Sequence, residues 1–220
     1  MSNLTEVTLP MLREHVDSAV LSDALDSLGF TRQVPSLELR PMTGCAKIVG
    51  RARTTLWADM FHVDPQPYEL ELRAVDACQA DDVLIAAAGG SNRSGIWGEL
   101  LSTAAKNRGC VGAVVDGMVR DVDKMTDMNF AVFARGTNCR DSQNRQRVVD
   151  LDVTVDIGGV TVHTGDLVLI DLDGMVVVPQ EVEREALSRA WNKIHAENVT
   201  RDAIRGGMKA MDAWKKYGVL

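Results

Sequence analysis

The stretch GGSNRSGIWGELLSTAAKNRGCVGAVVDGMVRD, residues 89–121, indicates the fold of this chain. It begins with a glycine-rich loop, continues as a helical segment from Gly98, and ends with an apolar run at 111–115 and the pair Arg120–Asp121. A short apolar run at 82–88 precedes the loop, and a helix between two apolar strands is typical of a βαβ unit. Because ligands of such sheets bind at the carboxyl ends of the strands, we expect the loop and the Arg–Asp pair to line one crevice.

The sequence on either side extends this pattern to a mixed α/β fold. Apolar residues at helical spacing alternate with short apolar runs up to Ser142, and beyond it apolar and polar residues alternate as in antiparallel strands. We expect a single domain over residues 1–220, with an α/β core over 1–180 and a C-terminal helical tail over 181–220. The predicted elements are helices over 9–28, 68–78, 98–108, 181–205 and 208–217, strands over 45–55, 82–88, 111–115, 131–134 and 148–157, and hairpins at 158–159 and 167–178.

Composition narrows the class of protein. The net charge of −7 and the absence of a basic cluster argue against a nucleic-acid partner. No apolar run reaches transmembrane length, and the first ten residues, MSNLTEVTLP, lack the apolar region of a signal peptide, so we expect no membrane partner and a cytoplasmic location. The four cysteines are far apart and form no CxxC pair, which argues against a zinc knuckle.

The glycine-rich loop and the helix after it form a candidate anion site. Glycines let the backbone approach a ligand closely, and the first N–H groups of a helix have no partner within the helix. The spacing fits neither the G-x4-G-K-[ST] nor the G-x-G-x-x-G phosphate loop, so a small carboxylate is a better candidate than a nucleotide. The loop alone is equally consistent with a plain glycine-rich connection.

Three charged side chains could carry chemistry beside that anion. Arg120 can bind a carboxylate or keto acid with two parallel hydrogen bonds, and Asp121 can bind a hard divalent cation that keeps several waters. Glu99, at the start of the helix, could transfer a proton. The plain alternatives are a surface salt bridge for Arg120–Asp121 and a first-turn acid favoured by the helix dipole for Glu99.

The order of these residues resembles a known family. Glu99, then the twenty residues from Leu100 to Val119, then Arg120–Asp121, matches an acid-x20-Arg-Asp signature. It is similar to the RraA-like family, which holds the 4-hydroxy-4-methyl-2-oxoglutarate and 4-carboxy-4-hydroxy-2-oxoadipate aldolases and regulators of ribonuclease E. Further matching pieces are SDAL at 22–25, VGAVVDG and VRDVD within 111–123, and VFARG at 132–136.

The resemblance implies a fold and a set of site residues. The fold would be a swivelling-domain-type α/β/α sandwich with a mixed sheet or barrel core, assembled as trimers or hexamers. The backbone of Gly98, Glu99, Leu100 and Leu101 and the side chain of Arg120 would bind the carboxylate and keto group of the substrate. Asp121 would bind Mg²⁺ or Mn²⁺, and Glu197 of an adjacent subunit would join the metal shell through water.

The activity that the resemblance implies is that of a divalent-metal-dependent (class II) pyruvate aldolase. It would cleave a small 4-hydroxy-2-oxo acid, such as 4-hydroxy-4-methyl-2-oxoglutarate, to pyruvate and a keto acid, with Glu99 and Arg120 as catalytic residues. Oxaloacetate decarboxylation is expected beside it. The alternatives are a non-catalytic regulator that binds ribonuclease E or a helicase, and another lyase or hydrolase acting on a keto acid.

This chain departs from many relatives near the signature. Glu99 stands where they have aspartate, and its carboxylate reaches one methylene further. We also expect Arg93 and Trp97 to add charge and bulk at the mouth of the site.

Overall fold

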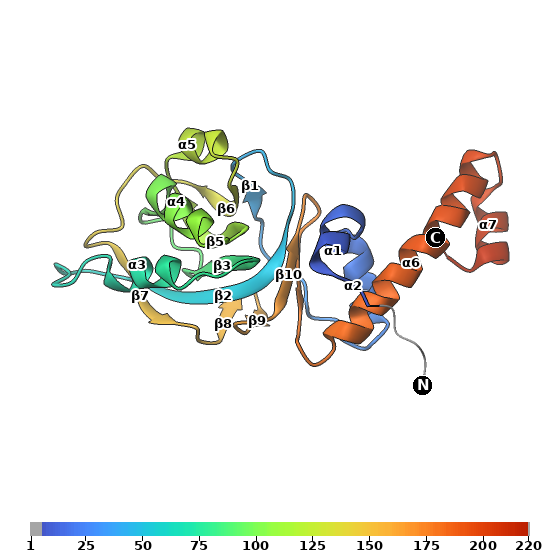
Figure 1. Ribbon diagram of the computed structural model, residues 1–220, viewed down its shortest axis with the longest axis horizontal. Coiled ribbons are helices and arrows are strands. Elements are labelled where there is room, and N and C mark those ends of the chain that lie inside the picture. Colours follow the sequence, from blue (N-terminus) through green and yellow to red (C-terminus); the bar gives the residue numbers. More distant parts are fainter. Residues whose placement is uncertain (1–5, 220) are drawn as a thin grey trace.

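The computed structural model describes residues 6–219 as a curled mixed β-sheet with helices on one face and at one end (Figure 1). The mixed α/β fold predicted from the sequence is confirmed. The elements are, in chain order, α1 (Leu9–His15), α2 (Ser18–Asp26), β1 (Arg40–Pro41), β2 (Ile48–Asp59), α3 (Glu69–Asp76), β3 (Asp82–Ala87), β4 (Gly95–Trp97), α4 (Glu99–Asn107), β5 (Gly112–Val119), α5 (Val122–Asp127), β6 (Ala131–Thr137), β7 (Gln146–Leu151), β8 (Val155–Ile157), β9 (Val160–Val162), β10 (Leu167–Ile170), β11 (Met175–Val178), α6 (Glu183–Arg205) and α7 (Ala210–Tyr217).

The main sheet has the strand order β1-β6-β5-β3-β2-β10-β11, with β4 paired to β5 and β7 paired to β2. Strands β2, β3, β5 and β6 run parallel, and β4 is parallel to β5, whereas β1, β7, β10 and β11 pair antiparallel with their neighbours. The parallel β3–β5 pairing confirms the predicted βαβ unit around residues 89–121. It brings the glycine-rich loop and the segment after β5 to the same edge of the sheet.

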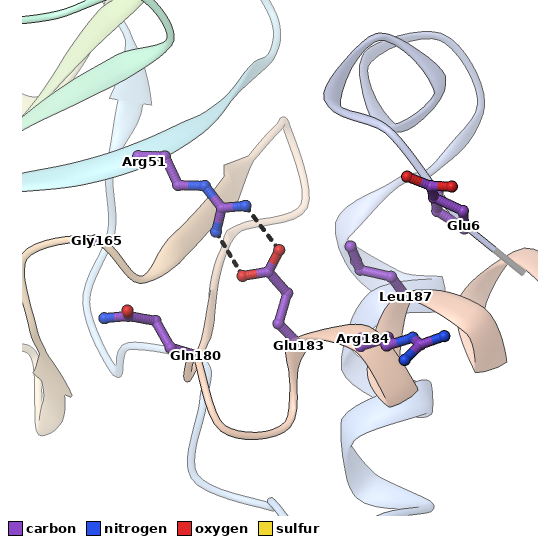
Figure 2. Close-up of a pocket in the computed structure, with 8 residues that line it drawn as sticks. Glu6, Arg51, Gly165, Gln180, Glu183, Arg184 and Leu187 are labelled. Carbon is purple, nitrogen blue, oxygen red and sulfur yellow. Dashed lines mark hydrogen bonds and ion pairs between the residues drawn. The ribbon is translucent and has the colours of Figure 1, made fainter. Parts of the chain in front are cut away.

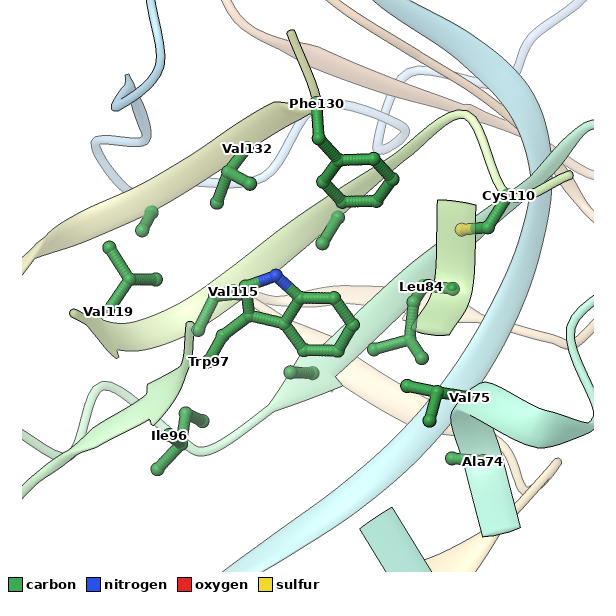
Figure 3. Close-up of a cluster of buried hydrophobic side chains, with 14 of the residues drawn as sticks. Ala74, Val75, Leu84, Ile96, Trp97, Cys110, Val115, Val119, Phe130 and Val132 are labelled. Atoms are coloured by element: carbon green, nitrogen blue, oxygen red, sulfur yellow. The ribbon is translucent and has the colours of Figure 1, made fainter. Parts of the chain in front are cut away.

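Helices α3, α4 and α5 cover one face of the sheet, and the β8–β9 hairpin covers the other (Figure 1). Under the helices lies an apolar cluster centred on Trp97, whose ring stacks on Phe130 at 6.5 Å between centroids (Figure 3). The Trp97 indole N–H donates to Ser102 Oγ of α4 at 2.8 Å. The indole is held by its stacking on Phe130 and by its hydrogen bond to Ser102. It therefore fixes the start of α4 against the sheet.

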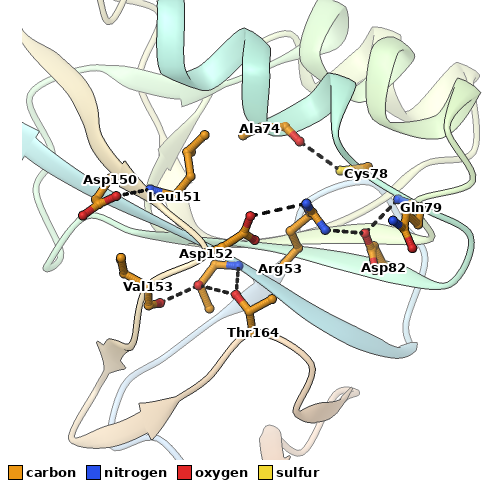
Figure 4. A network of polar contacts seen from close by, with 11 residues as sticks. Arg53, Ala74, Cys78, Gln79, Asp82, Asp150, Leu151, Asp152, Val153 and Thr164 are labelled. Atoms are coloured by element: carbon orange, nitrogen blue, oxygen red, sulfur yellow. Dashed lines mark hydrogen bonds and ion pairs between the residues drawn. The ribbon is translucent and has the colours of Figure 1, made fainter.

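A polar network ties β2 to the chain segments beside it (Figure 4). The Arg53 guanidinium lies between two carboxylates, 3.5 Å from Asp82 Oδ2 and 3.4 Å from Asp152 Oδ2. Asp82 Oδ2 also accepts a hydrogen bond of 2.8 Å from the Gln79 N–H, and Thr54 Oγ1 donates to the Val153 carbonyl at 2.5 Å. The network therefore holds the start of β3 and the β7–β8 connection on the central strand.

The third part of the molecule is helical. α1, α2 and the first half of α6 pack on β10 and β11, and α6 then projects from the body and carries α7 at its far end (Figure 1). Within residues 6–219 no helix is both long and apolar enough to cross a membrane. Residues 1–5 of the segment in which we expect no signal peptide lie outside the described residues.

Two elements that were predicted as continuous are each interrupted in the structure. The single helix over 9–28 is two helices, because Val16 and Asp17 adopt extended backbone angles. Lys47 Nζ accounts for the break by donating to three carbonyls at the end of α1, while Asp17 Oδ1 accepts from the Val20 N–H and so begins α2.

The predicted strand over 148–157 is likewise two strands, β7 and β8, in different sheets. Asp152, with φ of 53°, turns the chain off the edge of β2. The apolar–polar alternation continues through this turn, which is why the pattern hides it. Strand β4 and helix α5 are short elements that were not predicted from the sequence, whereas both predicted hairpins are confirmed.

Candidate active site

A cavity of about 330 Å³ lies between the start of α4 and the end of β5. Four chain segments line it: the start of α3, the β4–α4 junction, the residues after β5, and the loop after β6. Every site residue predicted from the sequence except Glu197 lines this cavity, namely Gly98, Glu99, Leu100, Leu101, Arg120 and Asp121.

The first turn of α4 presents free backbone N–H groups to the cavity. Gly98 is the N-cap, and its extended backbone leads directly into the helix. The Glu99 N–H points to Asp121 Oδ2 at 3.4 Å, and the Leu100 and Leu101 N–H groups have no partner within the helix. These two groups and the positive end of the helix dipole suit a carboxylate.

A side chain at position 98 would crowd the neighbouring carboxylate. A Cβ atom on Gly98 would lie 2.8 Å from Asp121 Oδ2 and 3.2 Å from Arg120 Cγ. The backbone of α4 and the Arg–Asp pair are thus in direct contact, as the order of the motifs predicts.

Arg120 lies between two carboxylates at the cavity wall. Its Nη2 is 2.8 Å from Asp141 Oδ2, and its Nε is 3.8 Å from Asp121 Oδ2. The backbone N–H of Arg120 donates to the Trp97 carbonyl at 2.8 Å, which fixes the residue to the β4–α4 junction. Its side chain keeps 36% of its surface exposed, so donors remain for a ligand.

Asp121 has the properties of a ligand for a hard cation. Its backbone is left-handed, with φ of 56°, and its carboxylate lines the cavity with 36% of the side chain exposed. Within residues 6–219 no group of three or more His, Cys, Asp or Glu side chains could enclose a metal ion. One open carboxylate fits Mg²⁺ or Mn²⁺, since such ions often bind through one or two carboxylates and keep their waters.

Among the further residues that line the cavity, three are ionisable and were not predicted from the sequence: Tyr68, Glu71 and Asp141. The Tyr68 hydroxyl donates to Asp141 Oδ1 at 2.8 Å, and burial together with this hydrogen bond raises the pKa of Tyr68 to about 12. Burial acts to raise the pKa of Asp141, but hydrogen bonds from the Gln143 N–H and Tyr68 and the charge of Arg120 outweigh it and hold that pKa below its ordinary value.

Glu71 is a buried carboxyl, with 8% of its surface exposed. Burial raises its pKa to about 7, the negative charges of Asp141 and Asp64 act in the same direction, and Arg120 opposes them. A signal for Glu71 exists in the sequence: it shares a helix face with Ala74, Val75 and Cys78, which are all buried, so it occupies a core-facing position. For Asp141, in an irregular loop, the sequence carries no such signal.

Comparison with known proteins assigns the chain to a family. The sequence model of the RraA-like family (Aldolase/RraA) matches residues 18–177. The chain belongs to the RraA-like family. A Halalkalibacterium halodurans protein that carries the provisional name 4-hydroxy-4-methyl-2-oxoglutarate aldolase is 30% identical over 199 residues, covering 90% of each chain.

Two solved structures share the fold of this RraA-like chain. An uncharacterized protein from Pseudomonas syringae superposes with a TM-score of 0.83 at 30% identity, covering 99% of this chain and 98% of the other. Streptomyces coelicolor RraAS2, described as an unusual member of the RNase ES inhibitor RraA protein family, superposes with a TM-score of 0.75 at 30% identity, covering 84% and 91%. The family therefore includes proteins named for an enzymatic and for an inhibitory role.

Other residues expected near the RraA-like site lie differently. Glu99 Oε1 accepts from Thr103 Oγ1 of its own helix at 3.3 Å, so its carboxylate lies along α4 at the cavity edge. Trp97 is among the residues that line the cavity, but its indole packs into the core beneath α4 (Figure 3). Arg93 is not among the residues lining the cavity: its guanidinium stacks on Phe61 at 4.3 Å and donates to the Met60 carbonyl.

Glu197 does not reach the cavity of its own chain. It lies on α6, 3.2 Å from Lys193 Nζ and 3.5 Å from Arg201 Nη2. Since the resemblance assigns this residue to the site of an adjacent subunit, its role stays a prediction.

A larger cavity of about 780 Å³ lies between β2 and the start of α6, away from the signature residues (Figure 2). Arg51 and Glu183 face each other there with two hydrogen bonds of 2.5 and 2.7 Å. Arg51 and Glu183 thus neutralise each other, and because the signature residues line the smaller cavity instead, that cavity is the better candidate for the active site of this RraA-like chain.

Proposed function

We propose that this protein is a divalent-metal-dependent pyruvate aldolase that cleaves a 4-hydroxy-2-oxo acid, such as 4-hydroxy-4-methyl-2-oxoglutarate, to pyruvate and a second keto acid. The observation that carries the proposal is one cavity lined by free N–H groups of α4, the Arg120 guanidinium and the Asp121 carboxylate. A 2-oxo acid has a carboxylate and a keto oxygen, and negative charge develops on the keto oxygen during cleavage. The N–H groups, the guanidinium and a metal held by the carboxylate complement these features.

The residues divide the work by position. The Leu100 and Leu101 N–H groups bind the substrate carboxylate, and Arg120 binds the carboxylate and the keto oxygen. Asp121 would hold Mg²⁺ or Mn²⁺, which supplies Lewis-acid stabilisation of negative charge at the keto oxygen. The pair Arg120–Asp141 holds the guanidinium in place before substrate binds, so little reorganisation is needed.

Decarboxylation of oxaloacetate is proposed as a second activity of this site. Loss of carbon dioxide from oxaloacetate leaves the enolate of pyruvate, the same species that cleavage of the C3–C4 bond produces. Groups that stabilise the first reaction therefore stabilise the second.

The test is a coupled assay of pyruvate formation from 4-hydroxy-4-methyl-2-oxoglutarate and from oxaloacetate, with Mg²⁺ or Mn²⁺ and with a chelator. We expect pyruvate from both substrates with metal and a loss of at least 100-fold with the chelator. If neither substrate yields pyruvate with either metal, the aldolase proposal is wrong.

The same assay also tests two alternative functions. The likeness to RraAS2 favours a regulator that binds ribonuclease E or a helicase, which predicts saturable binding to the ribonuclease and no metal-dependent turnover. Another lyase or hydrolase acting on a keto acid would turn over related substrates while leaving the aldol substrate intact. Pyruvate formation separates both from the aldolase.

A further inference from the structure

Glu71 is a carboxyl buried at the wall of the candidate active site without a fixed partner. It lines the same cavity as Arg120 and Asp121, and among residues 6–219 nothing hydrogen-bonds its carboxyl oxygens, which are open to the cavity and not sealed in the core. Burying an unpaired carboxyl is unfavourable unless the group neutralises or a ligand pairs with it. Its carboxyl is therefore available to a ligand that enters the cavity.

The other carboxylates of the cavity differ from Glu71 in their contacts or in their proposed role. Asp141 accepts from Tyr68 at Oδ1 and contacts Arg120 through Oδ2, so both of its oxygens are occupied. Asp121 is the carboxylate proposed to hold the metal, and Glu99 lies at the cavity edge, where its Oε1 accepts from Thr103 at 3.3 Å. Among the cavity carboxyls of residues 6–219, Glu71 combines burial with the absence of any hydrogen bond, which suits it to exchange a proton.

We propose that Glu71 transfers the proton of the cleavage reaction, taking it from the C4 hydroxyl of the substrate and returning it to C3. This assignment rests on the proposed function. The O–H bond breaks as the Glu71 carboxylate takes the proton, the new C4 carbonyl forms, and the electron pair of the C3–C4 bond passes to the pyruvate enolate. Glu71 then donates the same proton to C3, which gives the methyl group of pyruvate and regenerates the carboxylate.

The charges around Glu71 suit this exchange. Asp141 from the loop after β6 and Asp64 from the loop after β2 disfavour its ionised form, and Arg120 from the end of β5 favours it. The balance gives a pKa of about 7, so both protonation states are populated near neutral pH. A proton-transfer group with a pKa near the working pH is the most effective one.

The matched pair of variants is Glu71→Gln and Glu69→Gln. Glu69 lies on the same helix but is exposed, pairs with Arg73 at 3.8 Å, and does not line the cavity. With metal and aldol substrate we expect Glu71→Gln to lower kcat about 100-fold or more with little change in KM, and Glu69→Gln to behave as wild type.

Two further measurements separate proton transfer from a structural role. The wild-type kcat should rise with pH through about 7, and this limb should vanish in Glu71→Gln. Exchange of the methyl protons of pyruvate in deuterated water needs only removal of a proton from C3 and its return, without C–C cleavage, and it should be lost in Glu71→Gln and retained in Glu69→Gln. Circular dichroism and the thermal midpoint establish that both variants are folded.

The outcomes are distinguishable. If the wild-type protein makes no pyruvate, both the proposed function and the assignment of Glu71 are wrong. A wild-type chain that makes pyruvate, beside a folded Glu71→Gln variant with an unchanged rate, pH profile and methyl exchange, overturns the assignment alone.

Discussion

Among single residues, Asp121 offers the sharpest test of the metal site. Asn tolerates the left-handed backbone at this position, so Asp121→Asn removes the charge without straining the turn. We expect pyruvate formation to fall about 100-fold or more, and Mg²⁺ binding measured by calorimetry to be lost. The control is Asp123→Asn, two residues on and outside the cavity, which should bind the metal as wild type does. Equal metal affinity in the two variants would place the metal elsewhere.

Glu71 should make the stability of the metal-free protein depend on pH. Its pKa in the folded state, about 7, lies above the ordinary value of 4.5, so the folded protein holds this proton more tightly than the unfolded chain. Stability is therefore lost as pH rises from 4.5 through 7. Glu71→Gln removes this loss, and its stability advantage over wild type should grow by about 2 kcal/mol between roughly pH 5 and pH 8. Urea unfolding at both pH values measures it, and an advantage that does not change with pH would contradict the raised pKa.

Gly98 should be replaceable without unfolding the protein but not without losing activity. An alanine Cβ would press on Asp121 Oδ2 and Arg120 Cγ, displacing the two groups that the site depends on. We expect Gly98→Ala to lower kcat/KM by about 10- to 100-fold while the thermal midpoint changes little. In Gly206→Ala the added Cβ meets nothing closer than 3.4 Å, so it should retain full activity.

How much of the site the sequence predicts depends on how its residues are spaced along the chain. Gly98, Glu99 and the pair Arg120–Asp121 come from one βαβ unit, whose geometry is regular enough to bring them together. Tyr68 and Asp141 come from loops whose paths are set by tertiary packing, so no periodic pattern announces them. Glu71 could have been noticed as an acid on a buried helix face, but its nearness to Arg120 depends on how α3 docks on the sheet.

For single elements, the break between α1 and α2 gives a stability prediction. Asp17 caps α2 through the Val20 N–H at 2.9 Å, and Asp17→Ala should lower the free energy of unfolding by about 1 kcal/mol. For a chain of this size that is a fall in Tm of about 2–4 °C. Asp26, an exposed residue at the other end of α2, makes no side-chain cap, so Asp26→Ala should leave Tm nearly unchanged.

The elements themselves were predictable to unequal degrees. Buried parallel strands such as β3 and β5 are continuous apolar runs, and both hairpins have glycine at their turns, so these patterns are unambiguous. Strand β4 is only three residues long and exists because it pairs with β5, while the gap at 16–17 depends on Lys47, thirty residues away in sequence. Contacts of that range leave no local trace.

For the whole molecule, the prediction concerns subunits. If Glu197 of the partner subunit completes the site, then Asp121→Asn and Glu197→Gln damage different halves of it. Each variant alone should have low activity, and unfolding and refolding the two together should restore part of it, because some mixed sites then contain both intact residues. Mixtures that stay as inactive as the separate variants would show that each chain supplies its whole site.

Strand β2 lies beside partners from distant parts of the chain: β3 follows it closely, β7 begins at Gln146 and β10 at Leu167. A polypeptide emerging from the ribosome therefore exposes one edge of β2 until more than a hundred further residues have been made. The early pairing with β3, together with the Arg53–Asp82 contact, covers one edge of β2 and leaves the other edge without a partner strand during this time. Newly made chains should depend on chaperones during that interval, and arrest of translation before residue 167 should yield a protease-sensitive product, whereas arrest after β11 should yield a resistant one.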